Sequence, residues 1–373
     1  MKKKLLALVC ALVMIFSLAS CGLSTPDTVG KVGDFEVSSG LYLLAQFSAY
    51  QQAAQLAGTD QDATDVKAFL KETITTDADS GETAVVQDYV ADKTLETLRT
   101  FAAIDARFAE LGGELTAEQT QVADNYAQQL MDQYGSTYTA NGIGLETLKA
   151  FERIQLKHTL LLTLVYGPDG ESPVDDSDLT EHLDSQMYEL AYVNIPLYNT
   201  STFVSASDDQ KAQMLQLAQA AASCSETQDG SVSEQVSALH SAASAALPDI
   251  YAVLDSTPAE DASNVQTELL TESDLTGAFT QDGAADAVRG LVYGEAAAVQ
   301  YNAASIILMM RIDPLQVSTL DALRTQILSD MKGDELEDAL TAYGSTLEND
   351  LSTSAMNKMP ASKIVNPSSS SNS

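Results

Sequence analysis

The sequence predicts an α+β protein in which helices predominate. Two long segments, 83–111 and 145–166, place apolar residues at the three- and four-residue spacing of amphipathic helices. A third segment, Tyr188–Leu197, alternates apolar with other residues and is rich in β-branched and aromatic side chains, which is typical of a strand. With 373 residues, of which 45% are hydrophobic, the chain is long enough for two or three packed domains.

Composition and charge exclude several classes of function. The 19 Lys and Arg residues face 53 Asp and Glu, which gives a formal net charge of −34. A charge this negative repels phosphate backbones and anionic headgroups, so we expect no nucleic-acid partner. Three cysteines and three scattered histidines suit neither a disulfide framework nor a structural zinc site, so we expect no metal and no cofactor.

The N-terminus has the features of an export signal over residues 1–20. Three lysines precede the uncharged apolar run Leu5–Leu18, which is too short to span a bilayer comfortably and ends in small residues. Leu18-Ala19-Ser20-Cys21 resembles the lipobox of bacterial lipoproteins, in which Cys21 becomes the acylated first residue of the mature chain. An ordinary secretory signal with a chance cysteine is the alternative. We expect a lipidated tether over 21–28 and attachment to the outer face of the cytoplasmic membrane.

The first half of the mature chain is expected to be mainly helical. A hairpin turning at Gly33-Asp34 opens it, and Ser38 or Ser39 caps the next helix. Thr116-Ala117-Glu118-Gln119 is a capping box that follows the Gly112-Gly113 stop. The helices are expected over about 41–56, 83–111, from 117 to Tyr134-Gly135, and 145–166.

The second half mixes helix and strand signals. A short helix over 175–186 leads into the strand Tyr188–Leu197, and Leu291–Glu295 with Ser305–Arg311 are expected to form a final antiparallel pair. The other expected segments are a helix over 208–222, a polar stretch over 223–234, a helical or irregular segment over 236–273, an amphipathic helix over 319–351 and a disordered tail over 366–373.

This order of elements, opening with the Val32–Val37 hairpin, resembles the bacterial PrsA/SurA-type extracytoplasmic foldase lipoproteins with a degenerate parvulin-type (PpiC-like) prolyl isomerase domain. Tyr188–Leu197 resembles the first parvulin strand, and Ala287–Arg311 resembles the last helix, Gly-Glu turn and final strand. The resemblance implies a helical SurA-like chaperone domain built from the N- and C-terminal segments, with an inserted small parvulin-like α/β domain. The implied boundaries are 29–170 for the N-terminal helical part, 171–312 for the parvulin-like domain with an insertion at about 200–273, and 313–365 for the C-terminal helix.

The departures from the family concern its catalytic positions. Parvulins carry a histidine in the first strand and another in the last, where this chain has Tyr192 and Ser305, and neither strand contains a histidine. Amide resonance sets a barrier of roughly 18–20 kcal/mol to prolyl isomerisation. An apolar pocket can lower this barrier without histidines, but their loss weakens the case for catalysis, and we expect an inactive isomerase.

Other reactive side chains have plainer interpretations. His158 lies in an apolar helix, and His182 and His240 lie in polar ones, without metal or acid–thiol spacing. The acidic run Asp175–Asp178 lacks the spacing of an EF-hand and favours a helix N-terminus over a loose calcium site. Met309-Met310 places one side chain in the core and leaves the other for an adaptable peptide-binding surface.

The sequence thus favours a membrane-anchored extracytoplasmic chaperone whose partners are unfolded or newly secreted polypeptides. Helices between Leu41 and Tyr166, together with the C-terminal helix, would form a shallow apolar cradle for them. An active peptidyl-prolyl cis-trans isomerase is the first alternative. A solute-binding lipoprotein is the second, although the chain lacks the repeated strand–helix alternation of two α/β lobes.

Overall fold

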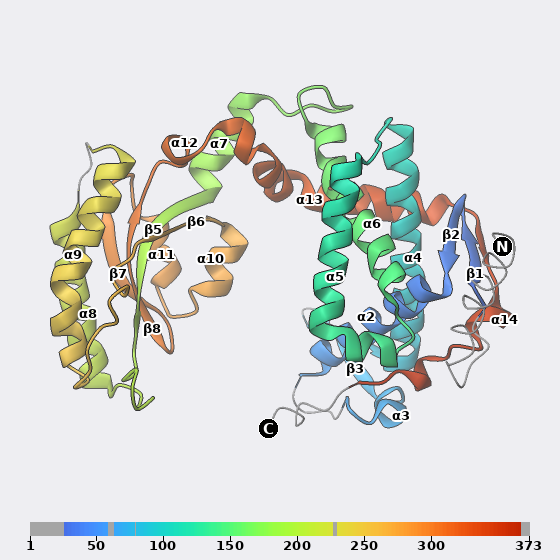
Figure 1. Ribbon diagram of the computed structural model, residues 1–373, viewed down its shortest axis with the longest axis horizontal. Helices are drawn as coiled ribbons and strands as arrows, with labels where there is room; N and C mark the ends of the chain where they lie inside the picture. Colours follow the sequence, from blue (N-terminus) through green and yellow to red (C-terminus); the bar gives the residue numbers. More distant parts are fainter. Residues whose placement is uncertain (1–25, 59–62, 79, 227–229, 367–373) are drawn as a thin grey trace, which may run out of the picture. The chain divides into compact units, whose positions relative to one another are not determined.

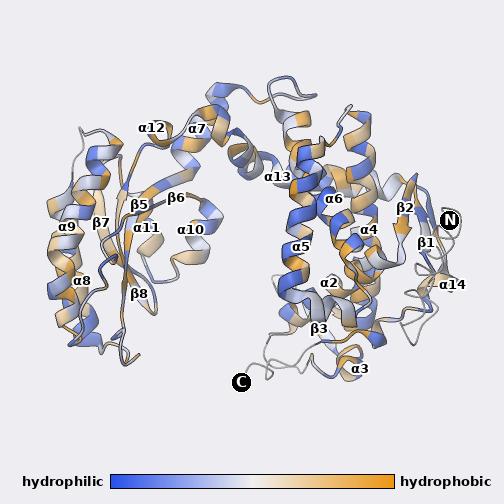
Figure 2. Ribbon diagram, viewed as in Figure 1, coloured by the Kyte–Doolittle hydropathy of each residue, from blue (hydrophilic) through white to orange (hydrophobic). Residues whose placement is uncertain are grey.

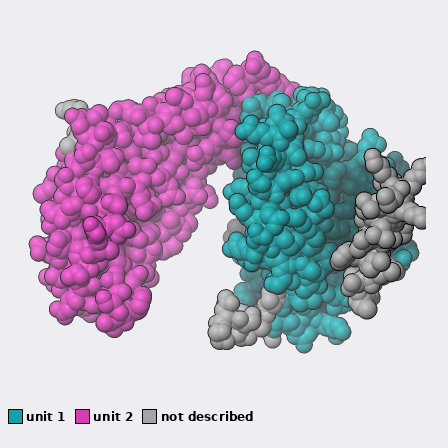
Figure 3. Space-filling model, viewed as in Figure 1, with its two compact units in different colours: residues 1–165, 334–373 teal, residues 166–333 magenta. Residues whose placement is uncertain are grey.

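The computed structural model describes residues 26–58, 63–78, 80–226 and 230–366. It forms two compact units, one of residues 1–165 and 334–373 (unit 1) and one of residues 166–333 (unit 2; Figures 1 and 3). Unit 1 is therefore built from both ends of the chain, and unit 2 is inserted between them. The predicted α+β class with a majority of helix is confirmed.

Unit 1 is predominantly helical. Its helices are α2 (Ser39–Ala57), α3 (Val66–Phe69), α4 (Val86–Glu110), α5 (Ala117–Ala140), α6 (Leu145–Tyr166, apart from its last residue), the C-terminal part of α13 (Leu320–Thr346), α14 (Thr353–Met356) and the 3₁₀ turn η3 (Ala361–Lys363). Its strands are β1 (Thr28–Val32), β2 (Phe35–Ser38), β3 (Thr73–Asp77), β4 (Glu82–Val85) and β9 (Asn349–Leu351).

A three-stranded sheet joins the two ends of the chain in unit 1. β1 lies between β2 and β9, and both pairings are antiparallel. Gly30 pairs with Leu351 at a φ of 122°, where an added Cβ would lie 2.2 Å from the Asp350 carbonyl oxygen. Only glycine fits this joint, because any side chain would collide with the backbone of β9.

Capping and burial account for the helices of unit 1. The Ser38 hydroxyl caps α2 by accepting from the Leu41 N–H at 3.2 Å. The capping box predicted at Thr116 is present, with Gln119 as its reciprocal partner. Side chains of α2, α3 and α4 share one buried cluster, in which the Tyr50 and Phe69 rings meet edge to face at 5.4 Å.

Two helix limits in unit 1 differ from the expectation. The long helix begins at Val86 rather than Thr83, because residues 82–85 form β4 and pair with β3 in a hairpin that the sequence pattern did not indicate. The helix expected to end at Tyr134-Gly135 continues to Ala140. Glycine inside a helix costs only about 1 kcal/mol relative to alanine, and Tyr138, one turn further on, packs against a buried cluster.

Unit 2 is built on a four-stranded antiparallel sheet with the order β6-β5-β8-β7. The strands are β5 (Met187–Pro196), β6 (Gln266–Thr271), β7 (Ala296–Asn302) and β8 (Ser305–Arg311). The helices are α7 (Asp176–Gln186), α8 (Asp208–Ser225), α9 (Val232–Ala252), α10 (Glu272–Ala278), α11 (Ala284–Arg289), α12 (Pro314–Val317) and the N-terminal part of α13.

Helices cover both faces of this sheet. Ala191, Val193 and Ile195 of β5 pack against α8 and α9, whereas Leu190 and Tyr192 face the side of α10 and α11. The central strands are strongly apolar, and β8 reads Ser-Ile-Ile-Leu-Met-Met-Arg (Figure 2). Such a run is expected for a strand that is buried on both faces.

The sheet contains two strands where the sequence pattern indicated something else. β6 lies within the segment expected to be helical or irregular, and it pairs with β5. The partner of β8 is Ala296–Asn302 rather than Leu291–Glu295, since Gly294 turns the chain at a φ of 81° just before β7 begins. The Gly294 N–H donates to the Arg311 carbonyl, and the Arg311 N–H donates to the Glu295 carbonyl. Two residues therefore face one, which is a β-bulge at the start of β7.

Candidate functional site

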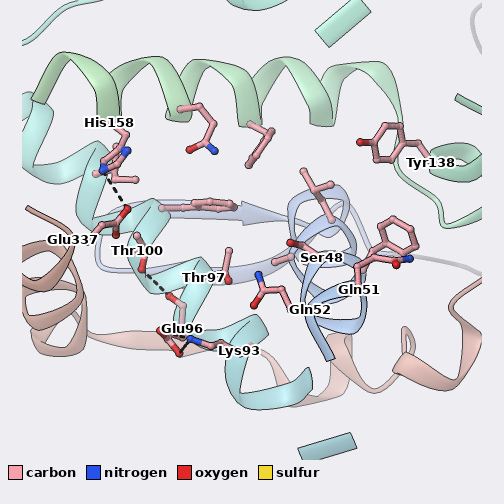
Figure 4. A pocket seen from close by; sticks show the side chains of 17 residues that line it. Ser48, Gln51, Gln52, Lys93, Glu96, Thr97, Thr100, Tyr138, His158 and Glu337 are labelled. Atoms are coloured by element: carbon pink, nitrogen blue, oxygen red, sulfur yellow. Dashed lines mark hydrogen bonds and ion pairs between the residues drawn. The ribbon is translucent and has the colours of Figure 1, made fainter. Parts of the chain in front are cut away.

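A hollow of about 590 Å³ lies among the helices of unit 1 (Figure 4). One face of α2, from Leu44 to Gln52, forms one wall, and residues 93–104 of α4 form another. α6 supplies Phe151, Gln155 and His158, while Tyr138 of α5 and Glu337 of α13 complete the lining. Segments from both ends of the chain therefore build this site.

The floor of the hollow is apolar and partly aromatic. The rings of Phe101 and Phe151 are 5.8 Å apart, and Phe47 belongs to the same lining. Phe101 is almost fully buried, whereas Phe47 and Phe151 are half-buried. The two half-buried rings are therefore the apolar surface that a bound molecule can reach.

The rim of the hollow is polar and carries both signs of charge. Lys93 forms an ion pair with Glu96 at 2.8 Å, and the Thr100 hydroxyl donates to the Glu96 carbonyl oxygen at 3.2 Å (Figure 4). Ser48, Gln51 and Gln52 face the hollow from α2. Burial raises the pKa of Tyr138, and the electrostatic effects of Tyr134 and Glu152 add to this shift. The Tyr138 hydroxyl therefore stays neutral and can donate a hydrogen bond.

His158 faces an acid at one end of the hollow. Its Nε2 lies 3.3 Å from Glu337 Oε1, within ion-pair reach, although this atom makes no hydrogen bond with the described residues. No group of three metal-ligating side chains occurs in the described part of the chain.

The two parvulin positions lie on one face of the sheet but do not meet. Tyr192 pairs with Met309, and Ser305 pairs with Pro196, four residues further along β5. That offset corresponds to roughly 13 Å along the strand. Tyr192 packs against the cluster on the α10 and α11 side, and alternation along β8 turns Ser305 to the same side.

Tyr192 and Ser305 also differ in surroundings. The Tyr192 hydroxyl donates to Glu268 Oε2 at 3.2 Å, and burial, together with this carboxylate, raises the pKa of Tyr192. Ser305 is buried, at 8% exposure. Neither β5 nor β8 contains a histidine.

The other candidates take structural roles. His182 Nε2 lies 2.6 Å from Asp330 Oδ2, and His240 Nδ1 lies 2.8 Å from the Ser263 carbonyl oxygen. In the acidic run, Asp175 is the N-cap residue of α7, and Asp176 pairs with Arg324 at 2.8 Å. Met309 and Met310 are both fully buried, which contradicts the expectation that one of them lies on a peptide-binding surface. Met310 packs into the buried cluster on the α8 and α9 side of the sheet, and Met309 packs into the cluster on the α10 and α11 side, so neither side chain is left exposed.

The residues behind the membrane-anchor prediction lie outside the described part of the chain. These are the signal at 1–20, Cys21 and most of the tether at 21–28. Among the described residues, no helix is both long and apolar enough to cross a membrane. All but the first residue of the expected disordered tail, 366–373, is likewise not described.

No local sequence motif marks the residues that line the hollow. Phe47, Phe101 and Phe151 lie on three helices separated by about fifty residues each, so no local motif joins them. The sequence offered one indication of the site: Phe47 lies next to Ser48 and one turn before Gln51 and Gln52, so an aromatic residue shares a helix face with polar ones. Such mixed faces indicate partial burial, but they do not indicate which helices meet.

No family model matches the sequence, and no curated protein matches it. The structure is similar to the foldase protein PrsA of Streptococcus pneumoniae, with 12% identity, a TM-score of 0.37, and coverage of 76% of this chain and 97% of that one. PrsA of Lactococcus lactis has 10% identity, a TM-score of 0.32 and coverage of 91% and 100%. PrsA of Bacillus subtilis has 12% identity, a TM-score of 0.27, and coverage of 78% of this chain and 93% of that one. Values this low transfer no activity and no residue role to this chain.

Proposed function

We propose that this protein is an extracytoplasmic chaperone of the foldase type, which holds unfolded or newly secreted polypeptides and is anchored to the membrane by a lipid on Cys21. The observation that carries the proposal is the hollow of unit 1. It combines an aromatic floor with a rim of amides, hydroxyls and charges of both signs. Such a lining accepts apolar side chains together with the polar backbone between them.

The size and chemistry of the hollow suit weak and reversible binding. At about 590 Å³, it falls in the range of roughly 300–1,000 Å³ typical of ligand sites. Each apolar side chain buried there contributes roughly 1.5–3 kcal/mol before the entropy of ordering the client is subtracted. The net charge of −34 keeps the chaperone soluble and disfavours acidic clients.

The sheet of unit 2 is proposed to be inactive as a prolyl isomerase. Tyr192 is engaged with Glu268, and Ser305 is buried about four residues away along the sheet, so the two do not form a facing pair. An isomerase assay distinguishes this proposal from the enzyme alternative. Addition of the protein is expected to leave the spontaneous rate unchanged, with relaxation over tens of seconds or longer. A rate that rises with protein concentration and falls in Tyr192→Ala would favour the enzyme.

The holding function is tested by suppression of client aggregation. Light scattering of a chemically unfolded, reduced secretory protein is followed with and without the chaperone. Phe47→Gln and Phe151→Gln remove the two accessible rings of the floor and are expected to reduce suppression at least several-fold. Tyr126→Gln is the matched control, because Tyr126 is an exposed aromatic residue of the same unit that does not line the hollow.

Two outcomes would contradict this function. Suppression that is unchanged in both phenylalanine variants would show that clients bind elsewhere. Tight binding of one defined small molecule, without any effect on aggregation, would favour the solute-binding alternative. Against that alternative, every strand pair in the described residues is antiparallel, whereas two α/β lobes are built on parallel strands.

A further inference from the structure

The segment 360–366, which follows α14, is held against the helices of unit 1 by side-chain amides. Asn141, the C-cap residue of α5, bonds to both backbone groups of Val365. Its Nδ2 donates to the Val365 carbonyl at 2.9 Å, and the Val365 N–H donates to its Oδ1 at 2.8 Å. One side-chain amide therefore pairs with Val365 as a residue of a neighbouring antiparallel strand would.

A second amide fixes the next residue. Gln51 Nε2 of α2 donates to Asn366 Oδ1 at 3.0 Å, and Asn366 Nδ2 donates to the Ala63 carbonyl at 3.0 Å. Asn141 and Gln51 form an amide clamp, in which two side chains from different helices hold consecutive residues of a peptide segment. The segment is thus bound to unit 1 in the manner of a ligand.

The clamp contacts backbone at Val365 and is oriented before any ligand binds. Asn141 Nδ2 also donates to the Thr137 carbonyl at 2.9 Å within α5, which fixes the direction of the amide. The Val365 side chain takes no part in these bonds and is 47% exposed. Any residue except proline, which lacks the N–H, can therefore supply the same pair of bonds at this position.

The clamp adjoins the hollow of unit 1. Gln51 belongs to the lining of the hollow, and so does Tyr138, which lies one turn before Asn141 on α5. Gln51 and Tyr138 lie at the end of the hollow away from His158 (Figure 4). An extended chain advances roughly 3.3 Å per residue, so a polypeptide held by the clamp can direct its next side chains into the hollow.

The protein's own segment is held weakly enough to be exchanged. Four hydrogen bonds fix Val365 and Asn366, and each is made at the expense of a bond to water. Ordering the residues 364–366 costs free energy of the same order as these bonds contribute. Ile364 is only half-buried where it packs on the cluster of α2, α3 and α4, so apolar burial adds little. A competing chain can therefore displace the segment.

We propose that the amide clamp is the backbone-binding part of the client site, and that Val365 occupies it in the free protein as an internal competitor. This rests on the proposed chaperone function and identifies the form of client: an extended segment with apolar side chains beside a residue other than proline. Ser48, Gln51 and Gln52 are uncharged, so this part of the site favours an uncharged segment. Because a client must displace Val365, its apparent affinity is reduced by the occupied fraction.

The first test opens the clamp by one substitution in the full chain. Val365→Pro removes the N–H that Asn141 accepts. Ile364 has a φ of −55° and a ψ of 138°, a conformation that a residue before proline readily adopts. Fluorescence anisotropy measures binding of a labelled peptide, Gly-Ser-Phe-Thr-Phe-Thr-Phe-Ser-Gly. Val365→Pro should bind it roughly five-fold or more tightly than the wild type.

Two further variants separate the clamp from a general loosening of unit 1. Val365→Ala keeps the N–H and is the matched control, expected to bind the peptide as the wild type does. Adding Asn141→Asp to Val365→Pro should abolish the gain, because a carboxylate cannot donate to a peptide carbonyl. Equal affinity of Val365→Pro and Val365→Ala would overturn the proposal, as would a gain that persists with Asn141→Asp.

A second measurement uses the wild type alone and decides the matter even if Val365→Pro does not fold. The amide hydrogen of Val365 is bonded to Asn141 in the free protein, so its exchange with solvent should be slowed. Saturation with the peptide should speed this exchange roughly ten-fold or more, because the peptide takes the place of the segment. Unchanged exchange at saturation would show that the segment 360–366 is a permanent part of unit 1 and would overturn the proposal.

The outcome can be separated from that of the proposed function. If the wild type suppresses aggregation through Phe47 and Phe151 while Val365 exchange does not respond to the peptide, the chaperone function stands and the clamp proposal fails. If the peptide displaces Val365 but the protein has no effect on aggregation, the clamp is a peptide site and the holding function fails instead.

Discussion

Substituting Gly344 tests whether the C-terminal helix is part of unit 1. Gly344 lies in the last turns of α13, against α4. A Cβ added there would sit 2.8 Å from the Arg99 carbonyl oxygen and 3.1 Å from its carbon. Ordinary contacts begin at 3.4 Å, so the two helix backbones must move apart by several tenths of an ångström. A backbone carbonyl cannot rotate away as the end of a side chain can.

The magnitude follows from two opposing effects. Forcing extra atoms into a packed contact costs about 1–3 kcal/mol. Replacing glycine with alanine inside a helix gains at most about 1 kcal/mol. Gly344→Ala is therefore expected to destabilise the protein by about 1 kcal/mol or more. Gly333→Ala on the same helix is the matched control, since the nearest atom to its added Cβ is a serine hydroxyl at 4.0 Å, and it should stabilise.

Calorimetric melting of the two variants measures this difference. A change of 1 kcal/mol shifts the Tm of a unit of this size by roughly 2–4 °C, so the two variants should differ by several degrees in opposite directions from the wild type. If Gly344→Ala is as stable as Gly333→Ala, α13 does not pack against α4. The assignment of residues 334–373 to unit 1 would then be wrong.

Three further outcomes are expected. Burial, and to a smaller extent the charge of Glu268, raises the pKa of Glu189, so its ionised form is disfavoured in the folded state. The stability that protonated Glu189 contributes is therefore present at low pH and is lost as the pH rises through its folded pKa. Glu189→Gln should raise the Tm at pH 7, but not at a pH below the ordinary pKa range of glutamate. A gain that persists at low pH would contradict this. Thr116→Ala should cost about 1 kcal/mol through loss of the N-cap of α5, with Thr116→Ser as the control, and equal stability of the two would refute the capping role. Cys21→Ala should release the protein from the membrane fraction or leave the signal uncleaved. Unchanged membrane retention with normal processing, together with no acyl label on the wild type, would refute the lipid anchor.

Local patterns in the sequence were sufficient for the elements whose causes are local. The Ser38 cap and the Thr116 capping box each depend on residues three or four positions apart, and both are present in the structure. The apolar spacing of α6 and the alternation of β5 likewise follow from one face being buried. The mostly helical α+β class rests on these features, so it could be read from the chain alone.

Elements that owe their structure to a distant partner were missed. β6 contains Gln266, Glu268 and two threonines and has a weak strand pattern of its own, and it is a strand because β5 lies beside it. β9, with three residues, is a strand only because β1 offers an unpaired edge. Pairing of this kind is decided by contacts between segments far apart in the sequence, which no local propensity contains.

The sequence by itself determined the acidic composition, the class of fold, and the absence of histidines from the strands that carry Tyr192 and Ser305, and it is the basis of the predicted export signal and lipid anchor. Only the tertiary structure decided that β9 pairs with β1 and that Phe47, Phe101 and Phe151 line one hollow. The physical reason is the range of the interactions. Capping, turn chemistry and periodic burial act over a few residues, whereas hollows and sheet edges arise only where separate segments meet.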